Sequence, residues 1–154
     1  MNSKNNQAKK VIKLFRPVII ILMRSWWFVT RPKTRGTKIV IICEDEILLL
    51  KTTYGYNYTL PGGGIDRNET PESAIRRESL EEVGIGLDMV VPLIPFVSNY
   101  EYKNDTVYGF YAEVKTKKYF LNNLEIDVAE WHKLDSLPKT GPVTARIIEL
   151  FKNT

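Results

Sequence analysis

Three glutamates within five residues, Glu78, Glu81 and Glu82, are the side chains of this sequence best suited to metal chemistry. On a helix, positions three and four apart share a face, so the three carboxylates would project to nearly the same side. Like charges this close destabilise a helix unless a cation lies between them. Oxygen ligands without neighbouring cysteines or several histidines favour Mg²⁺, with Mn²⁺ as the alternative. Because Mg²⁺ binds through a few carboxylates plus substrate phosphates, the pattern indicates phosphate chemistry.

A glycine run, residues 62–64, comes shortly before these glutamates. Consecutive glycines let the backbone turn tightly and expose its peptide groups to a ligand or metal. Arg77 directly precedes Glu78 and is expected to point away from the three glutamates. From there it would reach back to Glu69 and clamp the loop to the helix through a charge-assisted ion pair.

The spacing of these residues resembles the Nudix box, Gly-x5-Glu-x7-Arg-Glu-U-x-Glu-Glu-x-Gly-U, where U is a bulky apolar residue. The match runs from Gly63 to Ile85, and each position that the pattern assigns to Gly, Glu or Arg carries that residue. Ser79 departs from the pattern, which has an apolar residue there to pack the helix onto the sheet. The resemblance covers residues 36–151.

The resemblance implies roles for individual residues. A water molecule would attack phosphorus in a P–O–P link, with one carboxylate acting as general base. A further acid from a later loop, Glu125 or else Asp127, would join the site as ligand or base. The metal set would be Glu78, Glu81, Glu82 and a main-chain carbonyl of Gly62 or Gly63; the catalytic set Glu78, Glu81 and Glu125; and the structural pair Glu69 and Arg77.

The substrate implied by the resemblance is a nucleoside diphosphate linked to a second moiety. ADP-ribose, a nucleotide sugar, a nucleoside triphosphate and a dinucleoside polyphosphate all fit, whereas the family's signatures for NADH and coenzyme A are absent from the sequence. Tyr58, Tyr102 and Trp131 are candidates for substrate contact. Two alternatives stay open: a domain that only binds its ligand, and a protein at a membrane surface that acts on a lipid-linked diphosphate.

The elements that must position these residues follow from local signals. Thr70 as N-cap, Pro71 at the first helical position and Gly84 after the end predict the glutamate helix. Strands are predicted at residues 37–43 and 47–53, joined as a hairpin, and then at 88–97, 106–115 and 125–131, before a closing helix at 144–151. The fold class is therefore α+β, and the resemblance implies an α/β/α sandwich around a mixed sheet.

Residues 1–35 read as a basic arm that precedes the domain at 36–154. Every charged residue from Lys4 to Lys38 is Lys or Arg. Residues 1–9 look disordered, residues 10–29 form an amphipathic helix and residues 30–36 form a linker. The apolar run at 18–23 is far shorter than the ~20 residues that a spanning helix needs. The helix would contact its own domain, a second copy in a homodimer, or an anionic membrane surface.

Composition sets the remaining limits. The 154 residues fit one domain with a core of its own. Cys43 is the single cysteine, which excludes an intrachain disulfide and is typical of a cytoplasmic protein. Nucleic-acid binding is not expected, because the basic residues lie on an apolar arm without a groove of interleaved aromatic side chains.

Overall fold

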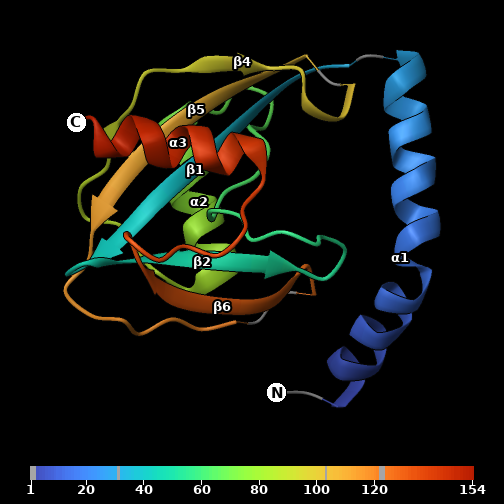
Figure 1. The fold of residues 1–154 in the computed structure, drawn as a ribbon, viewed down its shortest axis with the longest axis horizontal. Coiled ribbons are helices and arrows are strands. Elements are labelled where there is room, and N and C mark those ends of the chain that lie inside the picture. Colours follow the sequence, from blue (N-terminus) through green and yellow to red (C-terminus); the bar gives the residue numbers. More distant parts are fainter. Residues whose placement is uncertain (1–2, 31, 103, 122–123) are drawn as a thin grey trace.

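The computed structural model describes residues 3–30, 32–102, 104–121 and 124–154 (Figure 1). Two strands form a hairpin, β1 (Lys33–Cys43) and β2 (Glu46–Thr52), and the strands β3 (Val91–Pro92), β4 (Phe96–Ser98), β5 (Asn104–Glu113) and β6 (Ile126–Lys133) follow. The helices are α1 (Ser3–Thr30), α2 (Pro71–Val83) and α3 (Pro142–Lys152), with a short 3-10 helix η1 at Tyr100–Tyr102.

The sheet is mixed, and β1 lies at its centre. Its order is β3-β5-β1-β2-β6, and β4 also pairs with β5. The strands β1 and β5 run parallel over their whole length, whereas the other pairs are antiparallel. The hairpin turn needs a residue with positive φ, and Glu44 adopts φ 58° there.

Two hydrophobic cores cover the two faces of the sheet. Alternate side chains of a strand point to opposite faces, so Ile39 and Ile41 pack on the side of α2 and Val40 packs on the side of α3. All three side chains are fully buried. Figure 1 shows α2 and α3 on opposite sides of the sheet. The predicted α/β/α sandwich around a mixed sheet is thus confirmed.

Three elements differ from the sequence-based expectation. Residues 33–36 are not a linker, because they begin β1 and pair with residues 104–107 of β5. The strand expected at 88–97 is divided into β3 and β4, with Pro92 ending β3 and Pro95 preceding β4. Proline lacks the N–H that a continuous ladder requires. Residues 3–9 are helical rather than disordered, since α1 begins at Ser3.

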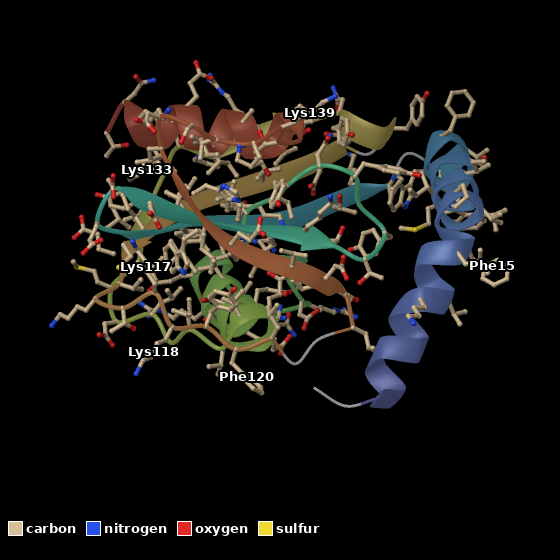
Figure 2. All side chains as sticks on the ribbon, turned by 60° about the horizontal axis from the view of Figure 1, so that its bottom comes forward. Phe15, Lys117, Lys118, Phe120, Lys133 and Lys139 are labelled. Atoms are coloured by element: carbon tan, nitrogen blue, oxygen red, sulfur yellow. The ribbon has the colours of Figure 1, made fainter. Side chains whose placement is uncertain are left out.

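The long helix α1 stands beside the sandwich rather than within it (Figure 1). Its contacts with the sandwich include the 3-10 helix η1. Figure 2 shows the Phe15 side chain on the side of α1 that faces away from the domain. Among the described helices, α1 included, none is long and apolar enough to cross a membrane.

Candidate functional site

The helix α2 begins and ends at the residues that its local signals predicted. Thr70 caps it with extended backbone (φ −81°, ψ 153°), and the Thr70 hydroxyl accepts a 3.1 Å hydrogen bond from the N–H of Ser73. Pro71 is the first helical residue. Gly84 ends the helix in the left-handed conformation at φ 67°, where its N–H bonds the Leu80 carbonyl.

Two of the three positions in the glycine loop leave no room for a side chain. Gly62 has φ 127°, and a β-carbon there would overlap the Thr37 carbonyl of β1. A β-carbon on Gly63 would come within 2.5 Å of a carboxylate oxygen of Glu78 on α2. The loop is therefore held between β1 and α2, with its backbone directly against a predicted metal ligand.

Two of the three glutamates face this loop. Glu82 is buried, and its Oε2 accepts a 2.8 Å hydrogen bond from the N–H of Gly62. Burial raises the pKa of the Glu82 carboxyl, and the nearby charges of Glu78 and Glu125 add to this rise. The Glu78 side chain is 15% exposed, whereas that of Glu81 is 57% exposed and open to solvent.

Arg77 makes the predicted clamp and further contacts that were not expected. Its Nε and Nη2 each donate a 3.0 Å hydrogen bond to the Glu69 carboxylate, and Nη2 also donates to the Gly64 carbonyl at 3.1 Å. The expectation that Arg77 points away from the glutamates is wrong. Its Nη1 lies 2.8 Å from Glu78 and 3.5 Å from Glu81, because the long guanidinium arm can fold across the helix face.

Lys38 is a functional candidate that the sequence reading missed. It comes from β1, and its ammonium donates hydrogen bonds to the carbonyls of Leu60, at 2.9 Å, and Gly62, at 2.5 Å. Burial lowers the pKa of Lys38, while the charges of Glu82, Glu78 and Asp105 act in the opposite direction. A lysine directly before the apolar run at residues 39–43 was the signal available in the sequence.

The two candidate carbonyls of the loop differ in their partners. The Gly63 carbonyl accepts a 2.9 Å hydrogen bond from the N–H of Thr37, within the backbone ladder. The Gly62 carbonyl faces the Lys38 ammonium, so it already binds a cation. This contrast favours Gly62 over Gly63 as the main-chain ligand.

The donor set around the loop fits a hard divalent cation. Carboxylate and carbonyl oxygens are the ligands that Mg²⁺ prefers, and Glu78, Glu82 and Gly62 supply them within one turn of α2 and the adjoining loop. Among the described residues, no three acidic, histidine or cysteine side chains are already gathered as a metal-binding group. Arg77 pairs with Glu78, and the Gly62 amide donates a hydrogen bond to Glu82.

The later acids lie at the start of β6. Glu125 is exposed, and its backbone carbonyl accepts a 2.7 Å hydrogen bond from the N–H of Thr53 at the end of the hairpin. The charge of Glu125 contributes to the raised pKa of Glu82, so Glu125 lies on the same side of the domain as the glycine loop. Asp127 follows on β6 and is partly buried.

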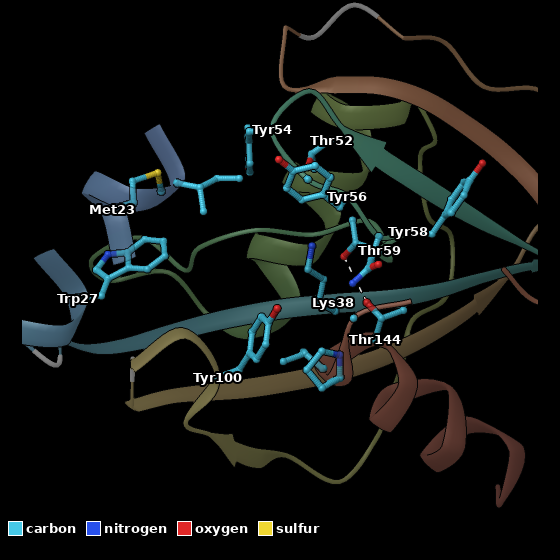
Figure 3. A pocket seen from close by; sticks show the side chains of 16 residues that line it. Met23, Trp27, Lys38, Thr52, Tyr54, Tyr56, Tyr58, Thr59, Tyr100 and Thr144 are labelled. Carbon is cyan, nitrogen blue, oxygen red and sulfur yellow. Dashed lines mark hydrogen bonds between the residues drawn. The ribbon is translucent and has the colours of Figure 1, made fainter. Parts of the chain in front are cut away.

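A pocket of about 360 Å³ is lined by Lys38 and by the segment 54–59 that precedes the glycine loop (Figure 3). Tyr58 is one of four lining tyrosines, with Tyr54, Tyr56 and Tyr100. Three side chains of α1, Ile20, Met23 and Trp27, form the opposite wall. Contact of this helix with its own domain was one of the alternatives left open by the sequence. The surface that it covers was not anticipated, because nothing local indicates which part of a domain a helix will contact.

The two other aromatic candidates lie elsewhere. Tyr102 packs edge-on against Phe28 of α1, with ring centroids 5.1 Å apart. The indole N–H of Trp131 donates a 3.0 Å hydrogen bond to the Lys117 carbonyl, and neither residue lines the pocket. Tyr58 donates a 2.5 Å hydrogen bond to Glu130, so its ring is held in one orientation beside the pocket.

Ser79, the departure from the box pattern, is fully buried. Its hydroxyl donates a 2.8 Å hydrogen bond to the Ile85 carbonyl just beyond the end of α2. A small polar residue is tolerated at this packing position because its one donor is satisfied. Ser79 thus ties the helix end to the segment that follows.

Comparison with known proteins gives the family. The NUDIX domain profile matches residues 32–151. The chain belongs to the Nudix hydrolase family. Diphosphoinositol polyphosphate phosphohydrolase 3-alpha of Mus musculus is 32% identical over 119 residues, which cover 71% of this chain and 70% of that protein. The NAD-capped RNA hydrolase NudC of Haemophilus influenzae is 33% identical, over 68% of this chain and 42% of NudC.

Solved structures of Nudix proteins share the fold. A MutT NUDIX hydrolase from Burkholderia pseudomallei has a TM-score of 0.68 at 23% identity and covers 77% of this chain and 97% of its own. The NUDIX domain of Shewanella oneidensis NrtR, solved in complex with ADP ribose, has a TM-score of 0.70 at 15% identity, covering 81% of this chain and 90% of its own. Nudix hydrolases generally use a divalent metal as their cofactor.

Proposed function

We propose that this Nudix protein is a Mg²⁺-dependent hydrolase that cleaves the phosphoanhydride of a nucleoside diphosphate linked to another moiety. The observation that carries the proposal is the packing of the Gly62 backbone against Glu82 and Lys38, with Glu78 against Gly63. These carboxylates and the cation-binding carbonyl border one loop, and Lys38, which donates to the Gly62 carbonyl, also lines the pocket. Mn²⁺ is the alternative metal, and the single buried thiol, Cys43, is in keeping with a cytoplasmic setting.

The residues would divide the work as follows. Glu78, Glu82 and the Gly62 carbonyl would hold the metal, with Glu81 supporting them. The bound cation supplies charge stabilisation for the phosphoryl oxygens and makes water a stronger nucleophile. Glu81, which is open to solvent, and Glu125 are the candidates to take the proton of the attacking water. As the new P–O bond forms, the bond from phosphorus to the bridging oxygen breaks.

The clamp of Arg77 on Glu69 would serve this site by fixing the loop. Arg77 contacts Gly64 and Glu69 in the loop and Glu78 on the helix, so it joins the loop to the helix. The four tyrosines of the pocket would bind the base, the sugar or the second moiety of the substrate. ADP-ribose, nucleotide sugars, nucleoside triphosphates and dinucleoside polyphosphates are the proposed substrate class.

A lipid-linked diphosphate is a second candidate substrate. The observation in its favour is the apolar wall that Ile20, Met23 and Trp27 give the pocket. An apolar tail leaving the active site would follow this wall along α1. A ligand-binding role without turnover is the remaining alternative. The loss of a box glutamate would favour it, but all of these glutamates are present.

A hydrolysis screen with and without Mg²⁺ tests the proposal. It should include the substrates named above, a prenyl diphosphate, and the diphosphoinositol polyphosphate and NAD-type compounds suggested by the names of the relatives. Glu82→Gln should lower turnover of the best substrate by at least ~100-fold, because the metal contributes several kcal/mol of charge stabilisation.

Glu72→Gln is the matched control. Glu72 lies on the same helix but pairs with Arg76 at 2.8 Å, outside the cluster, so turnover should stay near that of the parent chain. Turnover of Glu82→Gln close to the parent value would refute the metal assignment. Binding of a screened compound by the parent chain without any hydrolysis would favour the ligand-binding alternative.

A further inference from the structure

The outward face of α1 carries a continuous apolar stripe that the domain leaves uncovered. Six of its side chains recur at helical spacing and are between 52% and 79% exposed. We call them the outer face of α1: Leu14, Phe15, Val18, Leu22, Trp26 and Val29. Isolated apolar residues on a surface need no explanation, but a contiguous patch of this kind marks an interaction site.

The opposite side of the helix is already occupied, which fixes the direction of the outer face. Trp27 and its neighbours wall the pocket, and Phe28 stacks edge-on against Tyr102 of the 3-10 helix η1. Turning α1 to bury the outer face on its own domain would break both contacts. Figures 1 and 2 show the helix beside the sandwich, with Phe15 directed away from it. The partner of the outer face therefore lies outside this chain.

Charge decides which partner fits. Residues 1–43 contain ten Lys or Arg and not one Asp or Glu, whereas the rest of the chain has more acidic than basic residues. A second copy of α1 would bring an equally cationic helix into contact, and the two would repel. An anionic lipid surface offers the opposite charge, and each Lys or Arg near such a surface contributes about 1 kcal/mol.

We propose that the outer face of α1 docks on an anionic lipid surface. The apolar side chains would enter the boundary between headgroups and acyl chains, with Trp26 at headgroup level, and the helix would lie in the plane of the surface. Two signals act together here, apolar insertion and a polybasic segment, and stable peripheral binding generally needs two. Because the other side of α1 walls the pocket, docking places the pocket next to the membrane.

Vesicle flotation of the full chain tests this proposal. The parent protein should float with vesicles of phosphatidylcholine and phosphatidylglycerol in a ratio of about 3:1 and stay behind with pure phosphatidylcholine, and raising the salt should weaken binding. The double variant Leu14→Gln, Leu22→Gln should lower the partition coefficient by at least about tenfold. Glutamine favours helix nearly as well as leucine, so α1 itself is preserved.

The matched control places the same substitution at exposed apolar residues outside α1. Met89 and Ile94 are each 74% exposed, and Met89→Gln, Ile94→Gln should float like the parent. Circular dichroism melting verifies that both double variants are folded. Flotation needs no hydrolysis, so its outcome is independent of the substrate screen.

Three results would overturn the proposal. The first is no recovery of the parent protein with anionic vesicles. The second is equal flotation of the parent and the Leu14→Gln, Leu22→Gln variant. The third combines two observations: the parent is a dimer in sedimentation velocity but does not bind vesicles, and the Leu14→Gln, Leu22→Gln variant is a monomer. This result would assign the outer face to a second copy of the chain.

Discussion

Replacing Lys38 with methionine should destabilise the metal-free protein far more than the Mg²⁺-loaded protein. The ammonium of Lys38 bridges the carbonyls of Leu60 and Gly62 and is partly buried close to the charge of Glu82. Methionine keeps most of the apolar stem and removes only the charge and its hydrogen bonds. The substitution therefore isolates the contribution of one cation to the loop.

The size of the effect follows from these contacts. Desolvation opposes the Lys38 ammonium itself, but its removal leaves the Leu60 and Gly62 carbonyls and the buried Glu82 carboxylate without their cation. Leaving a buried charge unpaired costs about 3 kcal/mol, and this loss is expected for the metal-free protein. For a domain of this size, that corresponds to a fall in Tm of roughly 6–12 °C. With saturating Mg²⁺ at the Gly62 carbonyl and Glu82, the metal would replace the missing charge, and the loss should shrink to about 1 kcal/mol.

Thermodynamic linkage turns this difference into a binding measurement. A loss that is about 2 kcal/mol smaller in the loaded state means that the variant binds Mg²⁺ roughly 30-fold more tightly than the parent. Thermal melts at several Mg²⁺ concentrations, together with titration calorimetry, measure both quantities. Hydrolysis is not needed for either readout.

Lys133→Met is the matched control for this substitution. The Lys133 side chain is 59% exposed and lies 3.8 Å from Asp45, so its replacement should change the free energy of unfolding by no more than about 0.5 kcal/mol. If Lys38→Met lowered Tm equally with and without Mg²⁺, and Mg²⁺ affinity were unchanged, Lys38 and the metal would not share the Gly62 carbonyl. The reasoning would then be refuted.

Two further predictions concern the frame of the site. Ser79→Ala removes the buried hydrogen bond to the Ile85 carbonyl and should cost about 1 kcal/mol, or roughly 2–4 °C in Tm; a Tm equal to that of the parent would show that Ser79 does not hold the end of α2. Glu69 has a pKa below its ordinary 4.5, mainly because Arg77 donates hydrogen bonds to it. Its ionised form therefore adds stability above pH 4.5, and this is lost as the pH falls through the lower pKa of the folded state. Glu69→Gln should flatten the fall in Tm between pH 7 and pH 3, and curves that run parallel for both proteins would contradict this.

Signals within a few residues of one another determined the glutamate helix. Thr70, Pro71 and Gly84 act on backbone groups no more than five positions away, so their effect needs no distant partner. The pairing of Arg77 with Glu69 was equally accessible, because both lie on one continuous loop and helix. The order of the box residues makes the Nudix family recognisable from the sequence alone.

Contacts between distant segments were decided only by the tertiary structure. Residues 33–36 carry turn-forming residues and charge, yet they are strand because β5, some 70 positions later, supplies their hydrogen-bond partners. Lys38 acquires its role because the sheet brings it to a loop more than 20 residues away. The sequence by itself therefore determined the glutamate helix and the local frame of the proposed ligands. Lys38 beside Gly62 and the pocket wall on α1 required the fold, because backbone pairing and burial depend on segments that local signals cannot specify.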